Sequence, residues 1–193
     1  GVLYLVGLPA AALAVRVVTP DGMGLAAPRS AASVAQSLAV AGLAVIILVA
    51  TWTWLAPEVR PTRRAAVPAI DTLPSLALAT ALRETHWSFL RAAMLTLLAG
   101  RPDIAVAVAT GVAAIEAWTD PSRRASMTEP TQAALFSQGA AAAIVSGYTF
   151  LASGSSLLAW FVQFGTCAVL ATAVQRRAAE EMLTTGRHEP TIV

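Results

Sequence analysis

The chain of 193 residues has no lysine, a single cysteine, two histidines and few charges of either sign. Its cysteine, Cys167, lies within an apolar run, so neither an internal disulfide nor a thiolate metal cluster is available. Charged residues make up 12 %, about half of the share that is usual in soluble proteins. Because the net charge is only +2 and no basic run exceeds two residues, the sequence predicts no nucleic-acid partner.

Recognisable catalytic and cofactor motifs are also missing. Without lysine the chain cannot build the phosphate-binding loop of nucleotide hydrolases, and the patterns G-x-G-x-x-G and G-x-S-x-G do not occur. No histidine, cysteine or carboxylate follows His86 at the spacing of a zinc site on a helix. The sequence therefore predicts a protein that is not an enzyme and holds no cofactor and no metal.

What the chain has in excess is apolar surface. Hydrophobic residues make up 56 % of the sequence, and the mean hydropathy is +0.66. A soluble domain of this size buries only about 70 % of its unfolded surface, so it cannot hide this much apolar material. We therefore expect an all-α, polytopic integral membrane protein, with lipid as a partner.

The charge-free runs predict four membrane-spanning helices in two hairpins. The first hairpin comprises residues 2–18 and about 33–55. The charge-free run 131–175 would be roughly 67 Å long as one helix, which is enough for two crossings. Its small polar residues at 153–156 predict the turn between them.

Between these hairpins, residues 56–130 form a predicted cytoplasmic or membrane-surface insert of two helices, at about 73–99 and from 102 to about 118. On a helical projection of the first helix, one side is polar and the other apolar, which is typical of an amphipathic surface helix. The polar side carries Thr80, Arg83, Glu84, Trp87, Ser88 and Arg91, and the apolar side carries Leu78, Leu82, Phe89, Ala93 and Leu97. The domain division is thus 1–55, 56–130, 131–175 and a cytoplasmic tail at 176–193.

An alternative topology makes both insert helices into membrane crossings, giving six spans. Isolated charges at the bilayer centre cost at least about 2.5–3.5 kcal/mol each, so such charges must face a protein interior or an aqueous cavity. The residues to which this condition applies are Arg83, Glu84, His86, Arg91 and Glu116.

Small residues predict close helix packing in the second hairpin. Gly139, Ala143 and Gly147 recur every fourth residue, a spacing that lets a neighbouring helix approach to backbone contact. Gln163 should lie at the depth of Ser146 if the turn is centred near residue 154, which predicts a hydrogen bond between the two side chains.

Arg83 and Arg91 flank Trp87 by one helical turn on either side. This spacing permits cation–π contacts, and the same three residues suit anionic lipid head groups or a docking partner.

The leading functional hypothesis is a non-catalytic subunit of a larger complex in a bacterial cytoplasmic (inner) membrane, with both termini in the cytoplasm and other membrane subunits as partners. The arginine-only, alanine-rich composition is typical of a GC-rich bacterial genome, and the position of arginine in the short loops gives the orientation. The alternative is a homo-oligomeric small transporter or channel. Its polar path would include Gln138, Gln163, Ser146 and Glu116.

Overall fold

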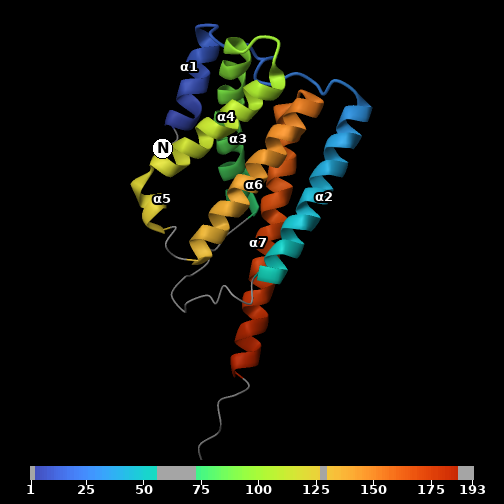
Figure 1. Cartoon of the computed structure of the whole chain (residues 1–193), viewed down its shortest axis with the longest axis vertical. Helices are drawn as coiled ribbons and strands as arrows, with labels where there is room; N and C mark the ends of the chain where they lie inside the picture. The colour runs from blue at the N-terminus through green and yellow to red at the C-terminus, as the bar shows by residue number, and fades with distance from the viewer. Residues whose placement is uncertain (1–2, 56–72, 127–129, 187–193) are drawn as a thin grey trace, which may run out of the picture.

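The computed structural model describes residues 3–55, 73–126 and 130–186, and every element in these ranges is helical (Figure 1). This confirms the all-α class. A π-helical turn, η1 (Leu3–Gly7), leads into α1 (Leu8–Ala14). The elements that follow are α2 (Ala31–Leu55), α3 (Leu73–Leu97), α4 (Pro102–Thr119), α5 (Pro121–Ser126), α6 (Pro130–Ser153) and α7 (Ser156–Gly186).

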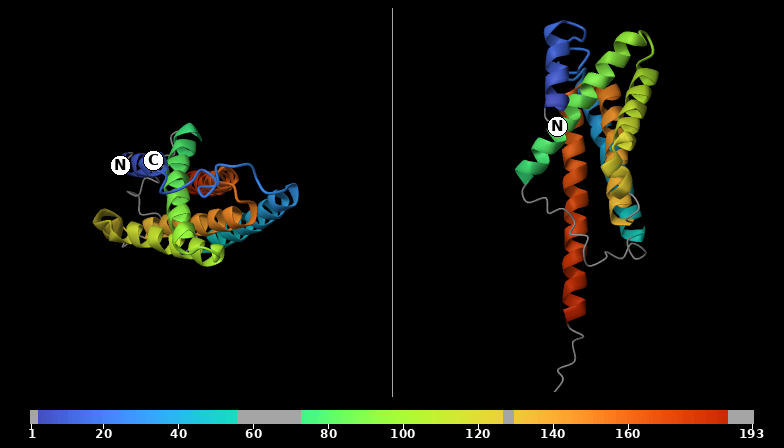
Figure 2. Two further views of the ribbon diagram at one scale, coloured as in Figure 1. Left: turned by 90° about the horizontal axis from the view of Figure 1, so that it is seen from above. Right: turned by 90° about the vertical axis from the view of Figure 1, so that its left-hand side faces the viewer.

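The long helices run alternately up and down in one bundle (Figures 1 and 2). α6 and α7 form an antiparallel pair, and α2 packs against both. α3 contacts α1, η1, α4 and α7, while α4 also contacts α6. α3 therefore lies among helices that come from either side of the predicted insert in the sequence, and α4 packs between α3 and α6.

Several predicted helix boundaries are confirmed. The charge-free run breaks at Gly154, whose φ of +72° favours glycine, and α7 ends at Gly186 as expected. α3 ends shortly before Gly100, which has a φ of +88°, and α4 begins at Pro102. The predicted cap of α3, at residues 71–72, lies outside the described residues.

The first predicted span is wrong in length. Arg16 adopts a left-handed φ of 59°, and the amide of Val17 bonds back to the carbonyl of Ala12 at 2.9 Å, which closes the helix at Ala14. The helical segment Leu3–Ala14 is therefore about 18 Å long, too short for the roughly 30 Å of a bilayer core.

Residues 15–30 form a loop that covers the turn between α6 and α7 at the upper end of the bundle (Figure 1). The amide of Arg29 donates to the carbonyl of Ser153 at 3.0 Å, and the amide of Ser156 donates to the carbonyl of Gly24 at 2.8 Å. Gly24 has a φ of +71°, and a Cβ there would lie 2.5 Å from Phe150. Only glycine fits this approach.

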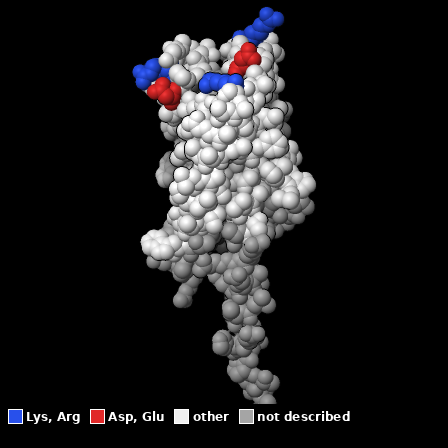
Figure 3. Space-filling view, turned by 90° about the vertical axis from the view of Figure 1, so that its right-hand side faces the viewer, with Lys and Arg blue, Asp and Glu red and all other residues white. Residues whose placement is uncertain are grey.

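The distribution of polar and apolar side chains is partly the reverse of that in a soluble protein, although small hydrophobic clusters are buried as well. The largest fully buried side chains include Gln163, Thr80, Thr149 and Thr166, whereas many leucines, isoleucines and valines are exposed. Figure 3 shows a face without acidic or basic side chains over most of the described height, with the charges at one end. Soluble domains bury the apolar types and leave threonine and glutamine mostly exposed.

Candidate functional site

The polar face of α3 points into the bundle. Thr80, Glu84, Ser88 and Arg91 follow one another at helical spacing, and each is at most 3 % exposed. On the same helix Leu97 is 73 % exposed. The sequence pattern thus placed these four residues on one face but predicted the opposite orientation, with the polar side outward. Two other members of the predicted faces do not follow the division, because Arg83 is exposed and Phe89 packs against a buried cluster.

Glu84 and Arg91 form a buried ion pair, with side-chain exposures of 4 % and 3 %. Nη2 of Arg91 donates to Oε1 of Glu84, and the hydroxyl of Ser146 on α6 donates to Oε2 at 2.7 Å. Nη1 of Arg91 donates to the same hydroxyl at 3.3 Å, and its guanidinium carbon lies 4.6 Å from the ring centre of Phe150. Both carboxylate oxygens therefore have a donor.

A chain of hydroxyls ties this pair to α7 and to the covering loop. Nη2 of Arg91 also donates to the hydroxyl of Ser88 at 3.1 Å, which in turn donates to the hydroxyl of Ser156 at 2.7 Å. Ser156 donates to the carbonyl of Met23 at 2.5 Å. The ion pair and its hydroxyls thus connect α3, α6, α7 and the loop over residues 15–30.

Burying an ion pair costs desolvation free energy, so a buried pair in a bundle calls for an explanation. Removing two charges from water is compensated only when their geometry is good and further hydrogen bonds satisfy the remaining groups. The three serines meet most of that requirement, but Nε of Arg91 has no partner among the described residues. A polar cluster of this kind in the core of a bundle is a candidate functional site.

On its Glu84 side the ion pair borders a cavity of about 410 Å³ between α1, α3 and α7. We call it the carboxylate cavity. Its polar lining comes from Glu84, Thr85, Ser88 and Ser156, and most of the remaining wall is apolar, including Trp160. No arginine lines it among the described residues.

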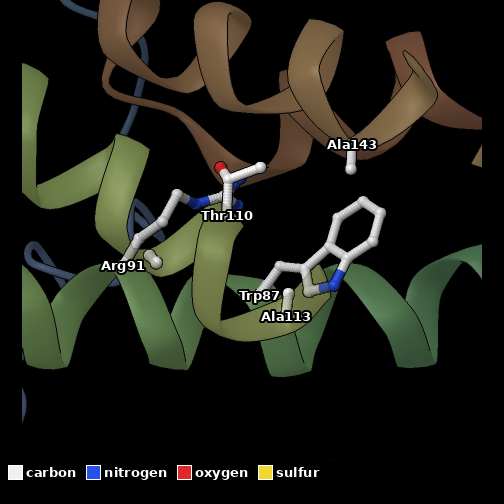
Figure 4. A pocket seen from close by; sticks show the side chains of 6 residues that line it. Trp87, Arg91, Thr110, Ala113 and Ala143 are labelled. Atoms are coloured by element: carbon white, nitrogen blue, oxygen red, sulfur yellow. The ribbon is translucent and has the colours of Figure 1, made fainter. Parts of the chain in front are cut away.

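On the Arg91 side lies a second cavity, of about 290 Å³, between α3, α4 and α6. We call it the guanidinium cavity. Arg83 lines this 290 Å³ part. Arg91 lines instead a smaller adjoining part of about 10 Å³, and we include both parts in the name. Trp87, Thr110, Ala113 and Ala143 border both parts, and four of the five labelled side chains in Figure 4 are these.

A second polar cluster joins η1, α3 and α4. Nε2 of His86 lies 2.8 Å from Oε2 of Glu116, and the hydroxyl of Tyr4 donates to Oε1 at 2.8 Å. His86 is 4 % exposed, and its Nδ1 has no partner among the described residues. The described part of the chain contains no group of three or more histidine, cysteine or acidic residues placed to hold a metal.

The predicted hydrogen bond between Gln163 and Ser146 is wrong. Gln163 is fully buried, but neither its Oε1 nor its Nε2 has a partner among the described residues. Ser146 instead bonds to Glu84 and Arg91, because hydrogen bonds to charged groups are stronger than those between neutral ones. The side chain of Gln138 lies outside the described part.

The stripe of small residues on α6 faces α4 and the guanidinium cavity. A Cβ at Gly147 would lie 3.2 Å from Val106 of α4, so the two helices approach closely at this point. Ala143 and Gly139 line the guanidinium cavity, and a Cβ at Gly139 would meet open space.

Of the three residues predicted to contact a partner or head groups, Arg83 is exposed, Trp87 is half-buried and Arg91 is buried. The structure corrects the expectation for Arg91, since its guanidinium is held by Glu84 and lies over Phe150 rather than Trp87. Arg83 and Trp87 still share one surface, the wall of the guanidinium cavity.

Sequence reasoning missed that Glu84 and Arg91 pair with each other. Their separation by seven residues, with Ser88 between them, was a usable signal, because it places an acid, a hydroxyl and a base on one helix face. The spacing on α3 does not predict that Ser146 and Ser156 lie near the pair, because tertiary packing of α6 and α7 places them there.

No model of a known protein family matches the chain, and neither a curated protein nor a solved structure matches it. The geometry of the bundle and of its two polar clusters is therefore the basis for proposing a function.

Proposed function

We propose that the chain is an integral membrane protein and that its bundle carries a path for a small polar solute past the Glu84–Arg91 pair. This develops the transporter alternative of the sequence analysis, with the path inside a single chain. The observation that carries it is the buried ion pair whose acidic and basic members line two different cavities.

The inverted burial supports lipid as the solvent. In a bilayer the apolar side chains face outward, and ionisable residues face the bundle interior, where they mark solute paths. α2 contains the one described segment, Ala31–Thr51, that is long and apolar enough to cross a membrane by itself. Such a segment is also typical of a signal sequence or a soluble core, but a core helix would be mostly buried and only 11 % of this one is.

The location of the pair supports a path rather than a purely structural role. Glu84 borders one cavity and Arg91 the other, so the pair lies between them. We propose that the pair separates the two cavities and that a polar solute passes by exchanging places with one of its members, as in transporters whose sites lie between helices near the bilayer midplane. The proposed role is non-catalytic and needs no cofactor.

We place the protein in a bacterial cytoplasmic membrane with the C-terminal end of α7 on the cytoplasmic side, following the arginine distribution. In this arrangement α3 and α4 cross the membrane, as in the six-span alternative, and α2, α6 and α7 cross it with them. These five crossings put the start of α2 on the opposite side of the membrane from the end of α7. The short segment Leu3–Ala14 enters it only in part.

A second candidate function, a subunit of a larger membrane complex, is favoured by α2. This helix contacts α6 and α7, and Leu38, Leu43, Ile46 and Ile47 on it are more than half exposed. Lipid or another membrane subunit would cover this surface. Mild detergent purification followed by native mass spectrometry tests it, because co-purifying foreign subunits support the complex and their absence contradicts it.

The path is tested in proteoliposomes by the rate at which they reswell in hyperosmotic glycerol, glycine or potassium phosphate. We expect at least one of these solutes to enter faster than into liposomes carrying the double variant Glu84→Leu/Arg91→Leu, which removes both charges together. Equal rates for all three solutes would overturn the proposed path. A chain that stays monodisperse in buffer without any amphiphile would overturn the membrane setting itself.

A further inference from the structure

The two cavities beside the ion pair differ in charge. Arg83 and Arg91 line the guanidinium cavity, and no acidic residue lines it among the described ones. The carboxylate that neutralises Arg91 borders the other cavity. Because Glu84 neutralises Arg91, the net positive charge of the guanidinium cavity comes from Arg83, and the other lining residues are uncharged. Low-dielectric surroundings strengthen the resulting positive potential.

Arg91 also has a donor to spare. Its Nη1 donates to Ser146, and its Nη2 donates to Glu84 and Ser88. Its Nε has no partner among the described residues, although the side chain is only 3 % exposed. A buried N–H without an acceptor is costly. The smaller adjoining part of the cavity, of about 10 Å³, has room for roughly one water or one ligand oxygen.

We propose that the guanidinium cavity binds a small organic anion, a phosphate or carboxylate with a short apolar body. One anion oxygen accepts from Nε of Arg91, and the remaining charge pairs with the guanidinium of Arg83. The apolar body lies against Trp87 and the alanines of α4 and α6. The volume of about 290 Å³ is at the small end of ligand sites, which limits the ligand to a head group and one short chain.

This inference names the class of solute for the proposed path. It rests on the proposed function for the role of the ligand. The same head-group chemistry has two sources, an anionic phospholipid or a soluble organic phosphate. The measurement below separates them.

The experiment uses the full chain in phosphatidylcholine nanodiscs and follows thermal unfolding during titration with hexyl phosphate. We expect a saturable rise of the midpoint, with no comparable rise from hexylammonium or hexanol at the same concentrations. Arg83→Gln should weaken the apparent affinity at least about tenfold, since it removes a charged hydrogen-bond partner. Ala143→Leu should abolish binding by filling the cavity.

Matched controls carry the same chemical changes elsewhere. Arg101→Gln removes an exposed arginine that lines neither cavity, and Ala35→Leu enlarges an exposed alanine of α2. Both should bind like the parent. The proposal is overturned if hexylammonium or hexanol acts like hexyl phosphate, or if Arg83→Gln responds like the parent. Because Arg83 is exposed, its variant should fold even if Ala143→Leu does not.

Discs containing phosphatidylglycerol then identify the source. If a lipid head group occupies the site, these discs raise the midpoint of the parent but not of Arg83→Gln, and hexyl phosphate adds little. If the ligand is soluble, phosphatidylglycerol leaves the titration unchanged. Binding without solute flux would contradict the proposed path but support the anion site. Solute flux without this binding would support the path but contradict the anion site.

Discussion

α2 and α3 have the same length, 25 residues each, but they differ in what they bury. α2 carries no charged residue and exposes Leu43 and Ile46. α3 buries Glu84 and Arg91 and exposes leucines at both ends. The proposed lipid solvent accounts for both helices, because water would favour the opposite orientation of α3 and a soluble core would cover α2. Amphipathic periodicity therefore shows which residues share a face, while the solvent decides which face is inside.

The largest effect should come from breaking the buried pair of α3. Replacing only one partner, as in Glu84→Leu or Arg91→Leu, should destabilise the fold by about 3–5 kcal/mol, because it leaves an uncompensated charge in the bundle. Reversible unfolding in mixed detergent micelles measures this loss.

The double variant Glu84→Leu/Arg91→Leu is the control for this comparison. Replacing both charges by leucine removes the desolvation cost together with the attraction, so it should be much less damaging than either single change. If the single variants are as stable as the parent, the pair does not lie in the apolar interior described here.

The proposal that α2 faces lipid is tested by placing a charge on its exposed surface. Ile46 is 66 % exposed, so Ile46→Arg would be nearly neutral in water, within about 0.5 kcal/mol. In a bilayer the same change should cost about 2.5–3.5 kcal/mol and reduce the membrane-inserted yield.

Leu97→Arg supplies the matched control, because Leu97 is 73 % exposed at the end of α3 that precedes the exposed ion pair of Arg101 and Asp103. It should leave yield and stability unchanged. If Ile46→Arg is equally harmless, α2 faces water, and the contrast between the two helices loses its explanation.

A third pair of variants compares the covering loop with α2. Gly24→Ala forces a Cβ against Phe150 at a φ of +71° and should cost about 1–3 kcal/mol. Gly42→Ala on α2 meets nothing within 4 Å, so it should be neutral or stabilise by up to about 1 kcal/mol. Thermal unfolding of both variants measures the difference in midpoint. Equal midpoints would show that the loop does not pack closely against α6 and α7.

The helices were predictable from the sequence because their signals are local. The glycines at 100 and 154, the proline at 102 and the charge-free runs lie within a few residues of the boundaries that they set. The candidate site was not predictable to the same degree. Its partners on α6 and α7, Ser146 and Ser156, are 55 or more residues from Arg91 and are ordinary serines in apolar runs.

The smallest effect concerns an exposed ion pair outside the uncharged band. At the start of α4 the guanidinium of Arg101 lies 3.4 Å from Asp103 and, together with a backbone amide, lowers the pKa of that carboxyl below its usual range. A lowered pKa in the folded state means that the resulting stability is present above the unfolded pKa and is lost as the pH falls through the folded value.

Asp103→Asn should therefore reduce the midpoint slightly at pH 7 and remove this part of the decline in acid, as thermal unfolding at pH 7 and pH 3 would show. The change should be far smaller than for Glu84→Leu, although both are arginine–carboxylate pairs. Arg101 and Asp103 are 64 % and 67 % exposed, so water screens their attraction and compensates either partner when the other is removed. A large loss of stability in Asp103→Asn would contradict this explanation. Breaking an arginine–carboxylate pair should strongly reduce stability only where no water can replace the lost partner.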